Sequence, residues 1–242
     1  MAENARVLVI GGGPGGYAAA FRAADHGLDV TVVDASDGLG GVCVDRGCIP
    51  SKALLTVMET ILLAREAEAA GVRFDAPEID LDRLRAWKDE VVDRLVEGLG
   101  GLAQGREIDV VKGRARFVSE NAVEIDGDRR LEFDHAILAT GSRPRPLPGV
   151  DFGERIMDST AALELRDVPD SLLVVGGGYV GLELGQVYAT LGSAVTLVEM
   201  TDALLPGTDP DLVKPLAESL DAAREVIAMR REIMEYMGVE FR

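Results

Sequence analysis

An internal repeat constrains the fold of this chain more than any other feature of its sequence. The segment GGGPGGYAAAFRAADHGLDVTVVD (11–34) aligns without gaps on GGGYVGLELGQVYATLGSAVTLVE (176–199), and each copy follows a short apolar run. Each copy contains G-x-G-x-x-G, a helical stretch, a second apolar run and a final carboxylate, Asp34 or Glu199, 23 positions after the first glycine. This pattern is typical of dinucleotide-binding βαβ units. We therefore predict an α/β fold with two such Rossmann-like units.

The three glycines of each motif have separate physical tasks. The first permits a tight turn, the second lets the backbone approach a pyrophosphate, and the third lets helix and strand pack closely. A pyrophosphate then lies against the free N–H groups at the positive end of the helix, and the carboxylate accepts hydrogen bonds from ribose hydroxyls. A single motif is also explained by simple packing, whereas two copies with equal acidic spacing favour nucleotide binding. The glycines are Gly11, Gly13 and Gly16 in the first copy and Gly176, Gly178 and Gly181 in the second.

Between the two copies, periodicity and turn residues predict two helices and several short strands. Residues 51–70 favour a helix with Ser51 as its N-cap and Gly71 as its stop, and residues 80–104 favour a second helix. Short β-like runs separated by turn residues then follow: IDVV, RARFV, AVEI, LEF and HAILAT.

A proline-rich stretch separates the two copies into two expected domains. The segment RPRPLPGV (143–150) indicates a change of chain direction. We expect the boundary near residues 150–170. The first domain would cover residues 1–150 and the second, a partial nucleotide-binding domain, residues 151–242.

Composition narrows the classes of partner. With 25 Lys and Arg against 42 Asp and Glu, the formal net charge is −17. An acidic surface repels phosphate backbones and anionic lipid headgroups, so we expect no nucleic-acid and no membrane partner. Only four of the basic residues are lysines, which suits a high-salt cytoplasm, although genomic base composition also favours arginine. We recognise no signal peptide and no apolar run near the roughly 20 residues of a spanning helix, and therefore expect a cytoplasmic protein.

Two cysteines lie in GLGGVCVDRGCIPSK (38–52), directly downstream of the first copy. Four residues separate Cys43 from Cys48, a spacing that can close a small disulfide loop across the first turn of a helix. The positive end of a helix stabilises a thiolate and lowers the pKa of a thiol there. Lys52 adds local positive charge.

Two alternatives to a redox role exist for this cysteine pair. Both thiols could be buried structural groups, or they could form half of a zinc site. Zinc needs two further ligands, and the two histidines, His26 and His135, lack ligand-like spacing, so we expect no metal. The position beside a dinucleotide fold favours the redox role.

The segment 38–52 resembles the redox-disulfide motif of the pyridine nucleotide–disulfide oxidoreductases, usually seen as GGTCxNxGCIPSK. Its Ile-Pro-Ser-Lys ending is most similar to the dihydrolipoamide dehydrogenase branch, with mercuric and glutathione reductases less similar. Val42 stands where Thr is usual, and Asp45 where Asn is usual. The segment 137–149 (ILATGSRPRPLPG) also resembles the part of the family that closes the first FAD section, and the second G-x-G-x-x-G resembles its NAD section.

The resemblance implies an FAD site in the first part of the chain. Asp34 would bind the adenosine ribose, although the family more often has Glu there. Lys52 would lie near the flavin and pair with Glu183, and Ala115 would contact the adenine through its backbone. The implied FAD-binding residues are Gly11, Gly13, Gly16, Asp34, Gly41, Lys52, Ala115, Thr140 and Gly141.

The resemblance also implies an NAD site and a route for electrons. The second glycine motif would hold the NAD pyrophosphate, and Glu199 favours NAD over NADP because a carboxylate repels a 2′-phosphate. A small-molecule or lipoyl dithiol would attack Cys43, the interchange thiol. Cys48 would lie against the flavin and pass electrons to it, and the reduced flavin would hand a hydride to NAD. Cys43, Cys48, Lys52 and Glu183 are the implied catalytic residues.

The resemblance runs from residue 6 to about residue 220. The family then continues with the rest of the NAD section, a G-D motif that completes the FAD site, and an interface domain whose His-Glu pair acts as general acid/base. We therefore expect the second βαβ unit to be incomplete, with an exposed sheet edge. The helix expected from about Asp209 is prolonged by DAAREVIAMRREIMEYMG before GVEFR. His26 and His135 read as structural, so the general acid/base is unassigned.

Three hypotheses for function follow. The first is an FAD-dependent, NAD-linked disulfide oxidoreductase that resembles dihydrolipoyl dehydrogenase. The second is a truncated nucleotide-binding remnant without turnover. The third is one half of a split enzyme, completed by another chain that supplies the missing C-terminal half.

Overall fold

The computed structural model describes residues 3–201 and 203–222, and these form two compact units. The first unit comprises the described residues up to Pro50 together with Trp87–Arg143. The second comprises Ser51–Ala86 and the described residues from Pro144 onward. The division into domains at residue 150 stays a prediction; the compact units divide at residue 143 and also assign the helical segment 51–86 to the second unit.

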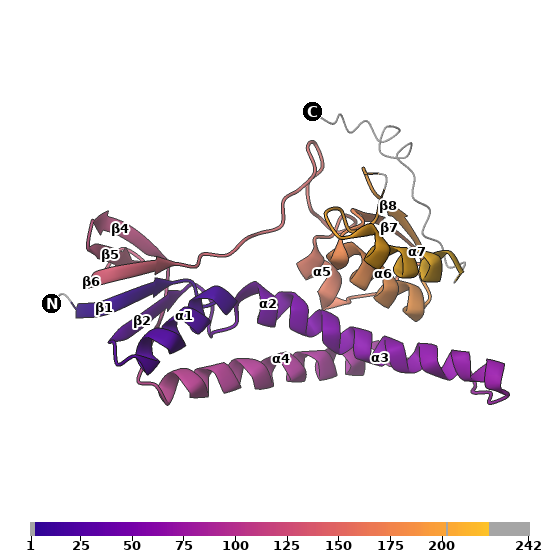
Figure 1. The fold of residues 1–242 in the computed structure, drawn as a ribbon, viewed down its shortest axis with the longest axis horizontal. Coiled ribbons are helices and arrows are strands. Elements are labelled where there is room, and N and C mark those ends of the chain that lie inside the picture. The colour runs from indigo at the N-terminus through magenta and orange to yellow at the C-terminus, as the bar shows by residue number, and fades with distance from the viewer. Residues whose placement is uncertain (1–2, 202, 223–242) are drawn as a thin grey trace. The chain divides into compact units, whose positions relative to one another are not determined.

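A six-stranded sheet forms the centre of the first unit (Figure 1). The strand order is β3-β2-β1-β6-β5-β4, with parallel pairing from β3 to β6 and antiparallel pairing among β6, β5 and β4. Strands β1 and β2 and the helix between them form the predicted βαβ unit. The strands are β1 (Glu3–Ile10), β2 (Val30–Asp34), β3 (Asp109–Lys112), β4 (Ala115–Ser119), β5 (Ala122–Ile125) and β6 (Arg129–Leu138).

The predicted division of residues 131–140 into two runs, LEF and HAILAT, is wrong. The structure has one strand, β6, of ten residues. Its first part pairs antiparallel with β5, and from Leu131 onward it also pairs parallel with β1. Asp134, the polar residue between the two runs, is an exposed position within this continuous strand.

Both faces of the sheet carry apolar core. Alternate side chains of a strand point to opposite faces, and β1 shows the pattern: Val7 and Val9 lie in one core cluster and Leu8 in another. The first cluster includes Ala20 of α1 (Pro14–Asp25). The two-sided burial explains why the parallel strands read as nearly continuous apolar runs.

Three helical segments lie between β2 and β3. They are α2 (Gly41–Arg46), α3 (Cys48–Glu66), which continues into the 3₁₀ turn η1 (Ala67–Ala70), and α4 (Leu81–Gln104). The helix predicted over 80–104 is confirmed, and Oδ1 of Asp80 accepts a hydrogen bond from the backbone N–H of Arg83 at 3.0 Å. Gly71 ends η1 in the left-handed region (φ 87°), as predicted for a stop.

Ser51 is not the N-cap of the helix that follows the cysteines, so that prediction is wrong. The helix begins three residues earlier, at Cys48, and Ser51 lies in its first turn. Pro50 suits this early position, because a backbone N–H there has no partner within the helix. The Ser51 side chain is buried and makes a contact within the second unit, described below.

The second unit contains a two-stranded parallel sheet, β7 (Ser171–Val175) with β8 (Ala194–Val198). Within the described residues these strands pair only with each other, in line with the expected exposed sheet edge. The helices that follow residue 143 in this unit are α5 (Ser159–Glu164), α6 (Tyr179–Leu191) and α7 (Pro210–Ala222). The start of α7 agrees with the helix expected from about residue 209, while the expected prolongation beyond residue 222 and the GVEFR segment lie outside the described residues.

The core of the second unit includes residues from α3. Leu54 and Met58 are fully buried among side chains of α5, α6 and β8, including Val187 and Tyr188. Residues of the helical segment 51–86 therefore contribute to the hydrophobic core of this unit.

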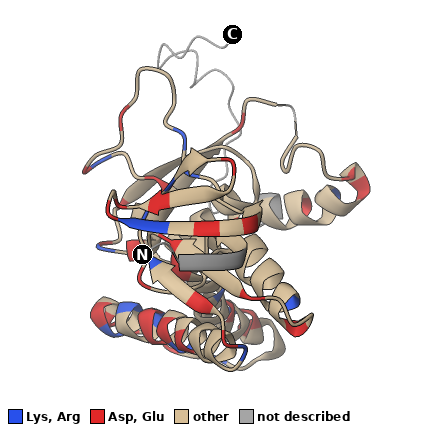
Figure 2. Ribbon diagram, turned by 90° about the vertical axis from the view of Figure 1, so that its left-hand side faces the viewer, with Lys and Arg blue, Asp and Glu red and all other residues tan. Residues whose placement is uncertain are grey.

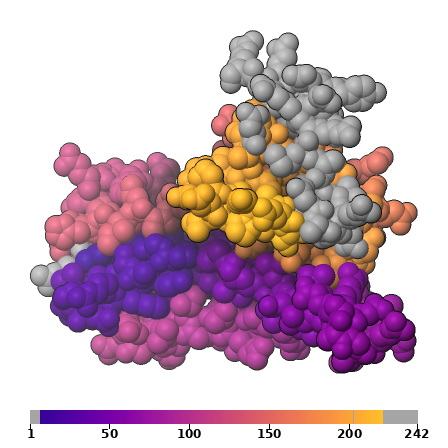
Figure 3. Space-filling view, turned by 45° about the vertical axis from the view of Figure 1, so that its right-hand side comes forward, coloured from indigo at the N-terminus to yellow at the C-terminus, as the bar shows by residue number. Residues whose placement is uncertain are grey.

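One apolar segment is longer than the sequence analysis allowed. Gly41–Ala70 is 30 residues long and has a mean hydropathy of 1.4 in its most apolar window, so by length and composition alone it could cross a membrane. The statement that no apolar run approaches this length was wrong. The helices of this segment lie at the surface of the space-filling view (Figure 3), yet Leu54 and Met58 are buried in the core of the second unit, and a core helix passes the same test.

The acidic residues are not gathered in one place. Asp and Glu occur on strands, helices and loops of the face in view, with Lys and Arg interleaved along the helices (Figure 2). In this view the acidic residues are therefore not confined to one element.

Candidate functional site

The first glycine motif forms a turn between β1 and α1 that side chains cannot enter. Gly11 has φ +105°, and a Cβ added to it would lie 2.1 Å from the carbonyl oxygen of Ala139. A Cβ on Gly16 would lie 1.7 Å from the carbonyl oxygen of Gly11. Both contacts are with backbone, which cannot move aside without breaking the sheet. The turn therefore requires glycine at these two positions.

The segment before the cysteines touches this turn. Gly41 has φ +58°, and a Cβ on it would lie 2.6 Å from Cα of Gly13. The backbone N–H of Gly40 donates a hydrogen bond to the carbonyl oxygen of Gly12 at 2.9 Å. Two glycine-rich segments thus meet backbone to backbone at the N-terminus of α1, whose N-cap is Gly13. We call this contact, formed by Gly11–Gly13 and Gly40–Gly41, the glycine cradle.

Asp34, the last residue of β2, binds the glycine cradle through its carboxylate. Its Oδ2 accepts a hydrogen bond from the Gly12 N–H at 2.5 Å, and its Oδ1 accepts one from the Ser36 N–H at 2.7 Å. Each oxygen keeps a further lone pair that can accept from a ribose hydroxyl. The sequence analysis did not single out Gly12 or Ser36, although the three consecutive glycines in both copies of the repeat could have indicated Gly12.

The segment after β6 completes the surroundings of the first turn. The Ala139 N–H donates to the carbonyl oxygen of Ile10 at 2.8 Å, so the residues that follow β6 run beside Gly11. Thr140 and Gly141 come next and are exposed, with Gly141 at φ +71°. Ala115, the predicted adenine contact, is the half-buried first residue of β4.

The second glycine motif repeats the carboxylate arrangement. Oε2 of Glu199 accepts from the Gly177 N–H at 2.7 Å, and Oε1 accepts from the N–H of Thr201 at 2.8 Å and from its hydroxyl at 3.0 Å. Burial opposes ionisation of Glu199, but these donors outweigh it and hold the pKa of the carboxyl below its usual value. Glu199 is thus an ionised ligand of its own turn.

The glycines of the second motif are less enclosed than those of the first. A Cβ on Gly181 would lie 2.2 Å from the carbonyl oxygen of Gly176, which matches the Gly16–Gly11 contact. Around Gly176 and Gly178, however, no described atom lies within 4 Å of an added Cβ. Position 176 still favours glycine, because its φ of +110° is one that other residues rarely adopt.

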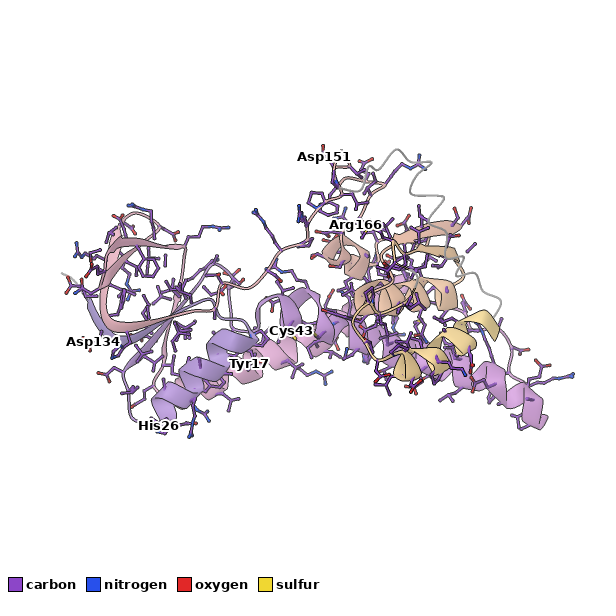
Figure 4. The ribbon with its side chains drawn as sticks, turned by 45° about the horizontal axis from the view of Figure 1, so that its top comes forward. Tyr17, His26, Cys43, Asp134, Asp151 and Arg166 are labelled. Carbon is purple, nitrogen blue, oxygen red and sulfur yellow. The ribbon has the colours of Figure 1, made fainter. Side chains whose placement is uncertain are left out.

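The two cysteines lie on separate helices in the first unit. Cys43 is in the short helix α2 and is half-buried (Figure 4), and Cys48 is the exposed first residue of α3. The expectation that both lie across the first turn of one helix is therefore wrong. Gly47 separates the helices, with a backbone (φ −147°, ψ −107°) that is not helical, and a Cβ on it would lie 2.7 Å from the carbonyl oxygen of Val42.

The predicted pair Lys52 and Glu183 is in contact within the second unit. Nζ of Lys52 lies 3.2 Å from Oε1 of Glu183. The sequence analysis missed a third member: the Ser51 hydroxyl donates to Oε2 of the same carboxylate at 2.5 Å. Ser51 is buried, whereas the Lys52 side chain is 62% exposed, so the two bonds to Glu183 lie in different surroundings.

The histidines do not contribute to the cysteine segment. His26 caps the C-terminus of α1, at the opposite end from the glycine turn (Figure 4), and His135 is an exposed residue of β6. Within residues 3–201 and 203–222, we find no cluster of three or more His, Cys, Asp or Glu side chains that could hold a metal ion.

Both glycine turns fit the diphosphate of a dinucleotide. Each presents bare backbone at the start of a helix, and in each a carboxylate fixes the turn from the end of the second strand. The residues predicted for the first turn, Gly11, Gly13, Gly16, Asp34 and Gly41, all lie together in the structure. The chain thus presents two glycine turns of one design, with the cysteine segment in contact with the first.

Comparison with known proteins agrees with this arrangement. Residues 5–236 match the family described as pyridine nucleotide-disulphide oxidoreductase. The dihydrolipoyl dehydrogenase of Vibrio cholerae is 48% identical over 215 residues, which cover 87% of this chain and 45% of the relative. Dihydrolipoyl dehydrogenase 2 of Haloarcula marismortui is 48% identical over 230 residues, covering 91% of this chain and 48% of the relative.

A solved structure shows the same fold. A Cu(II) complex of a mutant of the HOCl-induced flavoprotein disulfide reductase RclA from Escherichia coli superposes with a TM-score of 0.77 at 27% identity, covering 96% of this chain and 50% of that one. The predicted α/β fold is confirmed. This chain spans about half the length of the relatives it matches. From the family match over residues 5–236, we conclude that the chain belongs to the pyridine nucleotide-disulphide oxidoreductase family.

Proposed function

We propose that this chain carries the dithiol-reactive and nucleotide-binding parts of an FAD-dependent disulfide oxidoreductase similar to dihydrolipoyl dehydrogenase. The observation that carries the proposal is the contact between Gly41 and Gly13, which joins the cysteine segment directly to the first nucleotide turn. A nucleotide cofactor bound at the turn therefore lies beside the helix that bears Cys43. The names of the relatives support the same activity.

The first turn would hold FAD and the second NAD. At the first turn, the backbone of the glycine cradle would receive the diphosphate, and Asp34 would accept from ribose hydroxyls while it holds Gly12. At the second turn, the ionised Glu199 would bind a ribose and repel a 2′-phosphate, which favours NAD over NADP. Bound FAD would supply the route by which two electrons pass from the cysteines to NAD.

The chemistry of the cysteines follows thiol–disulfide exchange. A thiolate of the dithiol substrate attacks Sγ of Cys43 in the oxidised Cys43–Cys48 pair, the S–S bond breaks, and Cys48 leaves as a thiolate. The second substrate thiolate then displaces Cys43. The substrate leaves as a disulfide, and the two cysteines hold the two electrons it has lost. The exposure of Cys48 and partial exposure of Cys43 allow a substrate to reach them.

A further segment, on this or another polypeptide, would complete the enzyme. The chain spans about half the length of its relatives, and none of the described histidines lies on the cysteine segment to accept the substrate proton. We include a complementing chain in the proposal for this reason. Loss of a general acid/base typically lowers turnover by about 10²–10⁴-fold.

The test is an absorbance spectrum of the purified chain with added FAD, before and after anaerobic addition of a dithiol or of NADH. We expect bound flavin and, after reduction, a long-wavelength band from the Cys48 thiolate beside it. The Cys43→Ser variant should retain this band and the Cys48→Ser variant should lack it. A chain that never retains FAD, or a spectrum that dithiol and NADH leave unchanged, would overturn the proposal.

A further inference from the structure

Asp45 lies beside the glycine cradle. It is a half-buried residue of α2, and its Oδ1 would be 3.0 Å from a Cβ added to Gly40. The Gly40 N–H donates to the carbonyl oxygen of Gly12, and the adjacent Gly41 touches Gly13. The carboxyl of Asp45 therefore lies beside Gly40, a residue of the glycine cradle whose backbone would receive a diphosphate.

The surroundings of Asp45 disfavour its charge. Partial burial is the main cause, because it penalises the charged form of the carboxyl. The neighbouring Arg46 lowers the pKa, and like-charge repulsion from the Asp34 carboxylate raises it. The net effect is a pKa of Asp45 above its usual value. Arg46 and Asp34 are the charged groups that act on this carboxyl. A diphosphate bound at the glycine cradle would add further negative charge near the Asp45 carboxyl.

Resting on the proposed function, we propose that the charge of Asp45 controls the affinity of the glycine cradle for FAD, so that binding takes up a proton at the Asp45 carboxyl and weakens as the pH rises. The family motif usually has Asn at this position, which is neutral at every pH and leaves FAD binding independent of such a proton. Asp45 would therefore be a determinant of FAD affinity that the usual form of the motif lacks.

The direction of the effect follows from linkage. Negative charge on bound FAD favours the protonated form of Asp45, so its pKa is higher in the complex than in the free chain. Affinity is then highest below the pKa of the free chain and falls until the pH exceeds the pKa of the complex. A difference of about one pKa unit between the two states changes the dissociation constant about tenfold across this window.

The test measures FAD binding by quenching of flavin fluorescence at pH 5 and pH 8, at constant ionic strength, with the wild-type chain, Asp45→Asn and Asp37→Asn. Asp37 is a matched control, because it lies on the preceding loop, its side chain is 88% exposed and it pairs with Lys112. The Asp37→Asn substitution removes one negative charge from the same region of the chain as Asp45→Asn does. We expect the wild type and Asp37→Asn to bind FAD more weakly at pH 8 than at pH 5, by up to about tenfold. Asp45→Asn should bind equally at both pH values and more tightly than the wild type at pH 8, by up to about tenfold.

The outcomes separate this inference from the proposed function. Equal responses of Asp45→Asn and the wild type to pH, with FAD bound in both, would overturn the role of Asp45 and leave the proposed function standing. Absence of FAD binding at both pH values and in all three chains would overturn both. Circular dichroism of each chain at both pH values establishes that the folded state is compared throughout.

Discussion

The two glycine turns share a sequence motif but differ in what surrounds them. In the first, backbone of Ala139 lies over Gly11 and Gly41 touches Gly13, whereas the described residues around Gly176 and Gly178 leave both positions open. The first turn belongs to a six-stranded sheet and the second to a sheet of two described strands. The first turn is thus the more enclosed by neighbouring residues, but its carboxylate makes fewer hydrogen bonds. Asp34 accepts two, whereas Glu199 in the second turn accepts three.

This difference separates two functions of the same motif. The internal contact of the third glycine with the first, 1.7 Å in one turn and 2.2 Å in the other for an added Cβ, is needed to fold either βαβ unit. The contacts with Ala139 and Gly41 occur only in the first turn, where the cysteine segment arrives. The motif therefore encodes the turn, and the segments that meet it determine how far the turn is preformed as a site.

The largest expected effect is the difference in stability loss between Gly11→Ala and Gly176→Ala. Both variants place alanine at a φ above +100°, which we expect to cost roughly 1–3 kcal/mol. Gly11→Ala also drives a Cβ into the backbone of Ala139, and we expect at least about 2 kcal/mol more from this clash. Hydrogen exchange of β1 and β2 against β7 and β8 reports each unit separately.

Equal destabilisation by the two substitutions would contradict the comparison. It would mean that the backbone beside Gly11 moves aside and that the first turn is no more preformed than the second. Gly27→Ala is a suitable control, because Gly27 also has a positive φ (+76°) and no atom lies within 4 Å of its Cβ position.

The next effect concerns the carboxylates. Glu199→Gln loses charge-assisted hydrogen bonds to Gly177 and Thr201, and we expect a loss of about 2 kcal/mol at pH 7, more than for Asp34→Asn with its two bonds. Because the pKa of Glu199 is lowered in the folded chain, its stabilisation is present above the usual value of 4.5 and is lost as the pH falls through the folded value.

Urea unfolding between pH 3 and pH 7 checks the Glu199 prediction. The wild type should lose stability in the second unit over the acid part of this range, and Glu199→Gln should lose less. A wild-type chain and a Glu199→Gln chain with parallel pH profiles would show that other carboxyls determine acid stability.

A smaller effect distinguishes the helices of the two repeats. Tyr188 of α6 corresponds in the repeat to Ala23 of α1, is almost fully buried and donates to the carbonyl oxygen of Ala162 at 2.9 Å. Burial, with a contribution from the negative Asp167, raises the pKa of Tyr188 to about 12 from an ordinary 10.0. Its stabilisation is complete below pH 10 and is lost as the pH rises through the folded value of about 12.

Tyr188→Phe tests this difference. We expect a loss of about 1 kcal/mol at pH 7 from the missing hydrogen bond, with weaker dependence of stability on alkaline pH than in the wild type. Tyrosinate absorbance should show one late-titrating group in the wild type that the variant lacks. If the variant shows the same titration as the wild type in its late part, another tyrosine carries the shifted pKa.

The smallest effect lies at the pair that the sequence predicted. Lys52→Met removes a largely exposed ion pair with Glu183, and we expect a change below about 1 kcal/mol in the stability of the second unit. Ser51→Ala removes a buried hydrogen bond to the same carboxylate and should cost about 1–2 kcal/mol. Denaturant unfolding of the two variants measures both values. A larger loss for Lys52→Met than for Ser51→Ala would reverse this assignment of the stabilising contact.

Local features of the sequence predicted the turns and most elements. The run SLLVV predicts β7 at the bounds the structure shows, and the helix over 80–104 agrees within one residue. The glycine at each first position reflects a backbone conformation, and such requirements are visible in the sequence because few other residues satisfy them. The Lys52–Glu183 contact came from family resemblance, because 131 residues separate its members and no local pattern joins them.

The features that the sequence did not reveal depend on distant parts of the chain. The six-residue helix α2 is too short to show a helical period, so the sequence did not predict a separate helix that carries Cys43. Ser51 has the residue type of an N-cap, yet its hydroxyl bonds Glu183, which is 132 positions away. The continuity of β6 depends on its pairing with β1, which no periodicity within residues 129–138 can show.

The pairing of β1 with β6 also sets the order in which the chain can fold as it is synthesised. Val7 pairs with His135, so the central contact of the first sheet closes a loop of roughly 130 residues. A ribosome therefore releases β1, β2 and the whole helical segment 51–86 before β1 finds its second neighbour. A nascent chain that stops before residue 129 carries a central strand with one side unpaired, and such strands are targets for aggregation and for chaperones.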